Sequence, residues 1–284
     1  MLSYQHAYHA GSAADVHKHV TLSALLNRLH AKASAITCVD THAGRGLYPL
    51  DASETQRGGE YITGVVPIWT QRERLAARDP VLKVWLDDIA SLNGGQRALS
   101  RYPGSPWWFG HTLRDQDRLA LFELHPGEVK HLEHACAALP HNVRVTFSDG
   151  PHSLLQQLPY PTPRLCVLID PSYELKHEYA GMANTLAAIA HKVRHAIVML
   201  WYPILPQGYH DALLSDVVAQ GVRNVWQSEL MFRSSTQGRG MCGSGLLILN
   251  PPWRLNEALS KTFSLVAEVY GDSASHRGQW LVEE

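Results

Sequence analysis

Short apolar runs, separated by longer polar stretches, constrain the fold of this chain more than any other feature. Glycine, proline or aspartate flanks these runs, which occupy residues 36–40, 119–123, 143–147, 165–170, 195–201, 222–230 and 244–250. Runs of this kind are typical of strands buried on both faces of a parallel sheet, with helices in the connections. The clearest helix is predicted from Asp15 to Lys32, with Asp15 as its N-cap. We therefore expect an α/β fold with a mostly parallel, seven-stranded sheet.

One gap interrupts the regular spacing of the apolar runs. Residues 41–118 separate the first two runs, which is far more chain than a single crossover helix needs. Residues 49–103 are therefore predicted to form an inserted, mainly helical subdomain. Residues 1–48 and 104–284 would then form the core domain.

Composition excludes several classes of protein. Of the 284 residues, 45% are hydrophobic and 18% are charged, which is typical of a globular protein and excludes a disordered chain or a coiled coil. The apolar runs are too short for a transmembrane helix and the N-terminus has no signal-peptide pattern, so we expect a cytoplasmic protein without a membrane partner. The 17 histidines show no metal-binding spacing, so no metal site is predicted. With a formal net charge of −1, the chain would need a local basic surface to hold a nucleic acid.

A glycine-rich turn follows the first apolar run. Residues 41–46 (THAGRG) come directly after Asp40, and Gly44 and Gly46 would let the backbone approach a ligand closely. NAD is the main competing cofactor for such a turn. Pro49 argues against it, because a dinucleotide-binding turn places a further small residue near this position.

Polar residues also end the next three runs. Glu123 ends the second run and could accept hydrogen bonds from ribose hydroxyls, while Asp149-Gly150 after the third run suits an adenine amino group. The fourth run leads into residues 170–173 (DPSY). Because an open α/β sheet binds ligands at the carboxyl ends of its strands, the set predicts a nucleoside cofactor. The alternative is that Asp40, Glu123 and Asp149 only cap the helices that follow them.

Residues 170–173 resemble the [D/N]-P-P-[Y/F/W] motif of amino-group methyltransferases. The exocyclic nitrogen of adenine is a poor nucleophile, because its lone pair is delocalised into the ring. The carboxylate of Asp170 and the carbonyl of Pro171 can accept its two N–H bonds and hold the nitrogen in line with a methyl group. Tyr173 can stack on an unpaired base. Ser172 stands where the motif has proline, so the backbone there loses stiffness.

A second segment, residues 250–253 (NPPW), fits the same motif better by its letters. The order of the strand ends is similar to that of class I S-adenosylmethionine-dependent methyltransferases, whose seventh strand is antiparallel to the others. This resemblance places NPPW at the opposite edge of the sheet from the glycine-rich turn. It places DPSY beside the turn, because the fourth strand neighbours the first. We therefore assign the chemistry to DPSY.

More specific motifs lie along the whole chain. They occupy residues 2–19 (LSYQHAYHAGSAADVHKH), 40–46 (DTHAGRG), 102–106 (YPGSP), 123–126 (ELHP), 149–150 (DG), 200–203 (LWYP) and 250–253 (NPPW). Together they resemble the RlmJ family of bacterial 23S ribosomal RNA adenine-N6 methyltransferases, once labelled as proteins for catabolism of external DNA. The resemblance implies a Rossmann-like class I core that uses S-adenosylmethionine to methylate N6 of a specific adenine in 23S ribosomal RNA.

The resemblance also implies roles for individual residues. It assigns catalysis to Asp170 and assigns cofactor contacts to Lys18, His19, His42, Ser105, Glu123, Asp149 and Gly150, to which the glycine-rich turn adds Gly44 and Gly46. It further implies that residues 1–20 form a mobile N-terminal lid, whose Tyr4 and His6 meet the target adenosine. Arg233 and Arg239, in a loop without acidic residues, are predicted to contact the RNA as well. No obligate protein partner is predicted.

Two alternative functions stay open at this point. Ser172 leaves room for a catalytically weakened, nucleic-acid-binding protein of the same fold. The abundant histidines and the old family label leave room for a metal-dependent nuclease or another protein of external DNA utilisation.

Overall fold

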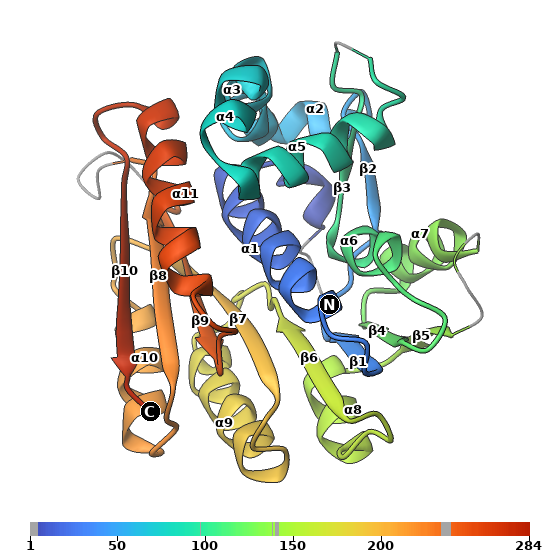
Figure 1. Cartoon of the computed structure of the whole chain (residues 1–284), viewed down its shortest axis with the longest axis vertical. Coiled ribbons are helices and arrows are strands. Elements are labelled where there is room, and N and C mark those ends of the chain that lie inside the picture. Colours follow the sequence, from blue (N-terminus) through green and yellow to red (C-terminus); the bar gives the residue numbers. More distant parts are fainter. Residues whose placement is uncertain (1–4, 97, 138, 140–141, 234–239) are drawn as a thin grey trace.

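A central sheet organises the computed structural model of the chain, which describes residues 5–96, 98–137, 139, 142–233 and 240–284. Within this part of the chain the sheet has eight strands in the order β10-β8-β9-β7-β6-β1-β4-β5 (Figure 1). The strands are β1 (Ile36–Asp40), β4 (Arg118–Glu123), β5 (Val143–Phe147), β6 (Arg164–Ile169), β7 (Ile197–Ile204), β8 (Val225–Met231), β9 (Gly243–Leu249) and β10 (Ser275–Val282). β5, β4, β1, β6 and β7 run parallel, whereas β9 is antiparallel to β7 and β8. The predicted α/β fold with a mostly parallel sheet is confirmed.

The strand count is a correction to the prediction of seven. β10 pairs antiparallel with β8 and lies at the outer edge of the sheet (Figure 1). Every residue of β10 is exposed or half-buried. An antiparallel edge strand can face water on one side, so it needs no apolar run. For that reason the apolar pattern missed it.

Helices cover both faces of the sheet. One layer holds α8 (Gly150–Gln157), α9 (His177–Lys192) and α10 (His210–Ala219), and the other holds α1 (Ala13–His30), α6 (Ser105–His111), α7 (Pro126–Cys136) and α11 (Leu255–Tyr270). Alternate residues of each strand face the two layers. In β6, for example, Cys166 and Leu168 belong to the cluster around α1, whereas Val167 belongs to the cluster around α9.

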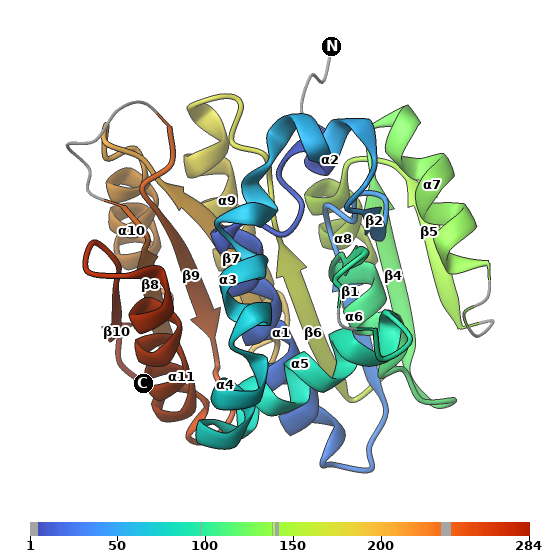
Figure 2. The same cartoon turned by 90° about the horizontal axis from the view of Figure 1, so that it is seen from above.

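The expected insertion contains several short helices. They are α2 (Ser53–Gly58), η2 (Glu60–Ile62), α3 (Val65–Thr70), α4 (Arg72–Arg78) and α5 (Pro80–Leu92), and a two-stranded ribbon of β2 (Leu47–Pro49) and β3 (Arg101–Pro103) closes the segment. Figure 2 shows α3, α4 and α5 lying over α1. Their buried side chains, among them Trp85 and Ile89, join the same hydrophobic cluster as the leucines of α1. The helices are thus an extra layer on the core, while the division into domains stays a prediction.

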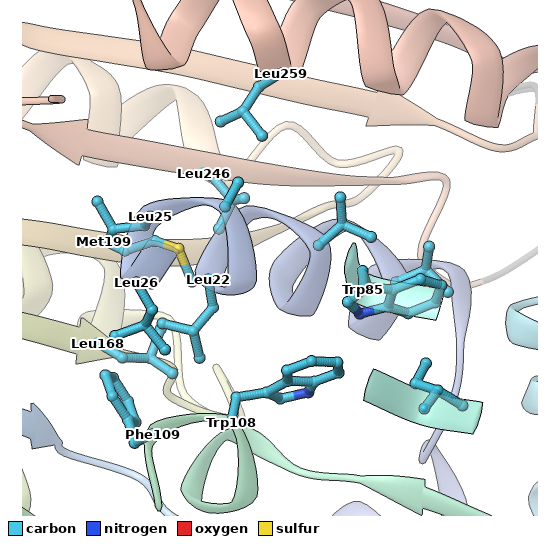
Figure 3. Packing of buried hydrophobic residues seen from close by; sticks show 14 of the residues in the cluster. Leu22, Leu25, Leu26, Trp85, Trp108, Phe109, Leu168, Met199, Leu246 and Leu259 are labelled. Atoms are coloured by element: carbon cyan, nitrogen blue, oxygen red, sulfur yellow. The ribbon is translucent and has the colours of Figure 1, made fainter. Parts of the chain in front are cut away.

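Helix α1 occupies the centre of this core. Figure 3 shows its leucines between strand residues such as Leu168 and Met199 on one side and the indoles of Trp85 and Trp108 on the other. Burying a leucine contributes about 1.5–3 kcal/mol, so this helix is a main source of stability. Apart from a short 3-10 turn, η1 (His6–Tyr8), it is the first element of the described chain.

The start of α1 corrects the predicted N-cap. Ser12, not Asp15, is the N-cap, since the Ser12 Oγ accepts a hydrogen bond from the Asp15 backbone N–H. The carboxylate of Asp15 is therefore available to other partners. Residues 14–20 of the predicted N-terminal lid are buried in α1, and the lid itself stays a prediction.

The two motif copies lie at opposite ends of the sheet. Asp170 directly follows β6, which pairs with β1. Asn250 directly follows the antiparallel β9, and its side-chain Nδ2 donates to the backbone oxygens of Arg194 and Ala196 just before β7 begins. The predicted separation is therefore present, although β9 lies inside the sheet rather than at its lateral edge.

Among the described helices, none combines the length and apolarity that crossing a membrane requires.

Candidate active site

A pocket opens where the carboxyl ends of β1, β4 and β6 meet the start of α8. The predicted residues that line it are His6, Lys18, His19, His42, Gly44, Ser105, Glu123, Asp149, Gly150 and Asp170. They come from seven separate stretches of the sequence, and the sheet order brings them together. The predicted catalytic and cofactor-binding positions thus share one cavity to a large extent.

The glycine-rich turn holds Glu123 in a fixed orientation. The Gly44 backbone N–H donates to Glu123 Oε2 over 2.7 Å, and the His125 backbone N–H donates to Oε1 over 2.7 Å. Gly44 has a φ of 63°, and a Cβ there would lie 2.5 Å from the Tyr48 hydroxyl oxygen. Glycine adopts this positive φ without strain and has no Cβ that would collide with the Tyr48 hydroxyl. The backbone turn and the carboxylate are therefore built as one unit.

Asp149 and Gly150 close the opposite side of the pocket. A Cβ on Gly150 would lie 1.9 Å from the Thr41 carbonyl oxygen, so glycine allows α8 to begin directly against the loop after β1. Asp149 Oδ1 accepts from the His152 backbone N–H over 2.8 Å as the N-cap of α8. The capping alternative therefore applies to Asp149, yet its side chain still lines the pocket.

Buried titratable groups surround the turn. Burial raises the pKa of Asp40 to about 7, while its Oδ1 accepts from the His42 backbone N–H. Burial lowers the pKa of His42 to about 4 and that of His19 to about 3, so both imidazoles are neutral at pH 7. The Nδ1 of His19 lies 3.0 Å from the Tyr102 hydroxyl. Its buried Nε2 has no hydrogen-bond partner among the described residues, so it is available to a ligand.

A chain of charges crosses the floor of the pocket. Lys18 Nζ lies 3.0 Å from Asp15 Oδ1 and 2.5 Å from Asp170 Oδ2, and all three groups are largely buried. Although burial disfavours its charge, the two carboxylates raise the pKa of Lys18. Asp15 Oδ2 also lies 2.9 Å from His6 Nε2 and accepts from the Gly11 backbone N–H. Despite burial, His6 and Lys18 hold the pKa of Asp15 well below its usual range.

Several residues of this site were missed by sequence reasoning. Asp15 precedes Lys18 by three residues on one helix, and this spacing is a signal that could have found the pair. Glu128 of α7 also lines the pocket and forms a bidentate pair with Arg45 of the glycine-rich turn, at 2.7 and 2.8 Å. Tyr48 lines it as well. No local pattern marks the pair of Glu128 and Arg45, because the two residues are 83 positions apart in the sequence.

Other predicted residues do not line the pocket. Gly46 lies against α7, and Pro171 is buried. The Tyr173 hydroxyl donates to the Trp201 carbonyl oxygen over 2.8 Å, and its ring packs on Tyr179. Arg233 lines a separate hollow beside Ser12 and Glu60. Tyr4 and Arg239 lie outside the described residues.

Among the residues that the structure describes, no three histidine, cysteine or acidic side chains converge on a point where they could hold a metal ion.

Comparisons with known proteins decide the family. A family model described as "Ribosomal RNA large subunit methyltransferase D, RlmJ" matches residues 33–282. The protein named "Ribosomal RNA large subunit methyltransferase J" from Escherichia coli (strain K12) is 36% identical over 287 residues, covering all of both chains. This chain belongs to the RlmJ family. The Haemophilus influenzae protein of the same name is 32% identical over 283 residues, which is all of this chain and 98% of that one.

A solved structure agrees with this family membership. The crystal structure of protein LPL1258 from Legionella pneumophila is similar with a TM-score of 0.87 and 33% identity, covering 96% of this chain and 98% of that one. By its membership of the RlmJ family, the chain is a methyltransferase, and S-adenosylmethionine is its cofactor. The pocket fits such a group, since it offers an oriented carboxylate at Glu123, a turn at Gly44 that a side chain would obstruct, and an unpartnered nitrogen on His19.

Proposed function

We propose that this chain methylates the exocyclic N6 of a specific adenine in 23S ribosomal RNA. Two RlmJ-family relatives are named as ribosomal RNA large subunit methyltransferases. The observation that carries the proposal is that Asp170, the first residue of DPSY, lines the same pocket as Gly44 and Glu123. A group that can hold an amino nitrogen thus shares a cavity with the glycine-rich turn of residues 41–46, which we call the cofactor turn below.

The cofactor contacts proposed here follow the polar strand ends. Glu123 would accept hydrogen bonds from the ribose hydroxyls, because each of its oxygens keeps a free lone pair beside the one used by a backbone N–H. Asp149 would accept from the adenine amino group. His19 and Ser105 lie at the other side of the pocket, near Lys18. When bound, S-adenosylmethionine supplies an electrophilic methyl group on a positively charged sulfur.

In this proposal Asp170 and the Pro171 carbonyl hold the target nitrogen. Each oxygen accepts a hydrogen bond from one N–H of the target nitrogen. The two hydrogen bonds direct the nitrogen lone pair toward the methyl group. Positioning of this kind can contribute about 7–11 kcal/mol to lowering the barrier. Lys18 Nζ holds one oxygen of the Asp170 carboxylate at 2.5 Å, which leaves the other oxygen to accept a hydrogen bond from the target nitrogen. As the N–C bond forms and the bond from the methyl group to the cofactor sulfur breaks, the electron pair would stay on the sulfur, and the target nitrogen would release one proton to the Asp170 carboxylate.

The proposed RNA contacts come from two parts of the sequence, the N-terminus with Tyr4 and His6 and the stretch with Arg233 and Arg239. His6 lines the pocket and lies 2.9 Å from Asp15, so it is positioned to meet the nucleotide that enters. Tyr4 would stack on that nucleotide, and Arg233 and Arg239 would contact phosphates. Tyr173, whose ring contacts Tyr179 and Trp201 and does not line the pocket described above, would stack on the adenine once the base lies beside Asp170.

Methyl transfer from radiolabelled cofactor tests the proposal. The chain is incubated with cofactor carrying a tritiated methyl group and with ribosomal RNA from cells that lack the family enzyme. We expect label in 23S RNA, and in N6-methyladenosine after digestion to nucleosides. RNA that already carries the modification is the control and should take up little label. Label in another nucleoside would contradict the N6 assignment, and RNA binding without transfer would support the catalytically weakened alternative.

A further inference from the structure

The inserted helices contact the segment that leads into the active site. Residues 5–12, called the N-terminal segment below, run along α2, η2 and α3 before α1 begins. A Cβ added to Gly58 of α2 would lie 1.7 Å from the Tyr8 carbonyl oxygen. Real side chains do not tolerate such a distance, and the obstacle is backbone rather than a flexible side chain. The absence of a side chain at Gly58 therefore sets how closely Tyr8 approaches α2.

A second close approach lies further along both stretches, between Gly11 and Gly64. The Val65 backbone N–H donates to the Gly11 carbonyl oxygen over 2.9 Å, and a Cβ on Gly64 would lie 2.2 Å from that oxygen. Between the two approaches, His9 Nδ1 lies 2.8 Å from Glu60 Oε1. Glu60 raises the pKa of His9 through this hydrogen bond. Two backbone contacts and one ion pair thus hold the N-terminal segment on the insertion.

The insertion is a rigid support for these contacts. Val65 and Ile68 of α3 are fully buried in the cluster that contains the leucines of α1. Asp79 caps α5 and accepts a hydrogen bond from Thr262 of α11, which fixes the insertion to the core on another side. A segment seated on this support therefore keeps its position relative to the sheet.

The same insertion is joined to the cofactor turn at both of its ends. β2 begins directly after Gly46, and β3 leads into Gly104 and Ser105. The Gly104 backbone N–H donates to the Gly46 carbonyl oxygen over 2.9 Å. Tyr48 of β2 lies with its ring 5.3 Å from the ring of His6. The insertion consequently bridges the cofactor turn and the N-terminal segment.

From these contacts we infer that the insertion is the seat that positions the N-terminal segment over the substrate side of the pocket, with Gly58 and Glu60 as positioning residues for methyl transfer to RNA. Neither residue touches the reacting atoms. Their effect is to hold His6 at the pocket while Lys18 and His19 stay on α1. This inference rests on the proposed function, since it needs the N-terminal segment to contact RNA.

The test compares two glycines in helices. Gly58→Ala places a methyl group against the Tyr8 carbonyl, whereas Gly181→Ala in α9 meets no atom within 4 Å and is the matched control. We expect Gly58→Ala to lower kcat/KM for RNA by about tenfold or more, through KM, while the cofactor Kd changes less than about twofold. Hydrogen exchange of residues 5–12 should become faster. Gly181→Ala should leave all three quantities unchanged.

A milder variant guards against a general loss of structure. Glu60→Gln keeps the shape of the side chain and removes its charge, so a smaller rise in KM for RNA is expected, of about two- to threefold, with an unchanged melting temperature. Unchanged KM and unchanged exchange at residues 5–12 in Gly58→Ala would overturn the inference, as would an equal loss of cofactor affinity. If the unmodified chain transfers no methyl group, the proposed function itself fails, and that outcome is separate from a failure of Gly58→Ala to differ.

Discussion

Two copies of nearly the same four-residue motif stand at opposite ends of one sheet and have different surroundings. At DPSY, the Asp170 carboxylate lines a pocket, keeps one oxygen on Lys18 and faces the cofactor turn. At NPPW, the Asn250 Nδ2 donates hydrogen bonds to two backbone oxygens, and the Trp253 side chain is 85% exposed. DPSY follows a parallel strand, and NPPW follows an antiparallel one.

The difference shows that letters alone do not make a catalytic motif. NPPW fits the methyltransferase pattern better, yet its polar side chain closes a loop onto the start of β7. DPSY departs from the pattern at Ser172, but its carboxylate is held where a ligand can reach it. What separates them is strand direction, because it decides which end of the sheet a strand-end residue reaches. The predictions below test this contrast, beginning with the largest expected effect.

Removing the polar side chain at each motif should affect different properties. Asp170→Ala should lower kcat for methyl transfer by roughly 10³-fold and change the cofactor Kd by less than about threefold, because the group acts on the target nitrogen. Asn250→Ala should keep kcat within twofold. It should lower the free energy of unfolding by about 1–3 kcal/mol, because two backbone oxygens lose their donor. Transfer assays and urea denaturation measure the two effects, and a loss of kcat in Asn250→Ala would contradict the contrast.

At the DPSY end of the sheet, the positive charge of Lys18 balances the buried carboxylates of Asp15 and Asp170. Lys18→Met would leave Asp15 and Asp170 buried without their cation, so we expect a loss of about 3–5 kcal/mol in unfolding free energy and roughly 10²-fold in kcat/KM. Lys18 helps to hold the pKa of Asp15 down, and such a group stabilises the fold above its unfolded pKa and loses this effect as pH falls. The stability gap between the unmodified chain and the variant should therefore shrink as pH falls below about 4, the usual pKa of an unfolded Asp. Denaturation at several pH values checks this, and a constant gap would contradict it.

The buried carboxyl of Asp40 should make the free energy of unfolding depend on pH in a second way. Its folded-state pKa of about 7 lies above the usual value of 3.8, so the folded chain binds the proton more tightly than the unfolded chain. Stability should therefore be lost as pH rises from about 4 through 7. Asp40→Asn keeps an oxygen for the His42 N–H and removes the charge, so it should gain on the order of 1–2 kcal/mol relative to the unmodified chain at pH 8 and less at pH 5. Equal stability differences at both pH values would contradict the assignment.

The aromatic residues of the two motifs should show the smallest effects. Trp253→Ser should change the unfolding free energy by less than about 0.5 kcal/mol, because the side chain is mostly in solvent. Tyr173→Phe should cost about 1 kcal/mol, because the hydroxyl loses its hydrogen bond to Trp201. Thermal melts measure both, and an equal or larger effect at Trp253 would show that the NPPW end has a partner surface of its own.

Much of the fold could be predicted because it depends on local sequence. Apolar runs gave the first seven strands of the central sheet, and polar strand ends gave most of the pocket, since parallel strands end on one side. β10 could not be found this way, because one side of an edge strand is solvated. The N-cap of α1 was misplaced by three residues, because Ser12 and Asp15 both suit that position.

The contacts that could not be predicted join residues far apart in the sequence. Glu128 pairs with Arg45, and Tyr8 approaches Gly58, only after the sheet and the insertion have assembled. The buried side chains of the insertion complete the core around α1, and no local pattern shows this packing. A hydrophobic pattern shows which side chains are buried, but not against which neighbour they pack.

The most direct test of the account is a crystal structure of the chain with S-adenosylhomocysteine, the product form of the cofactor. We expect its ribose at Glu123, its adenine at Asp149, and its sulfur facing Asp170 across the pocket that Gly44 borders. The Asn250 end of the sheet should stay free of ligand. A ligand bound beside Asn250, or one whose sulfur points away from Asp170, would contradict the claim that the glycine-rich turn and DPSY form one active site.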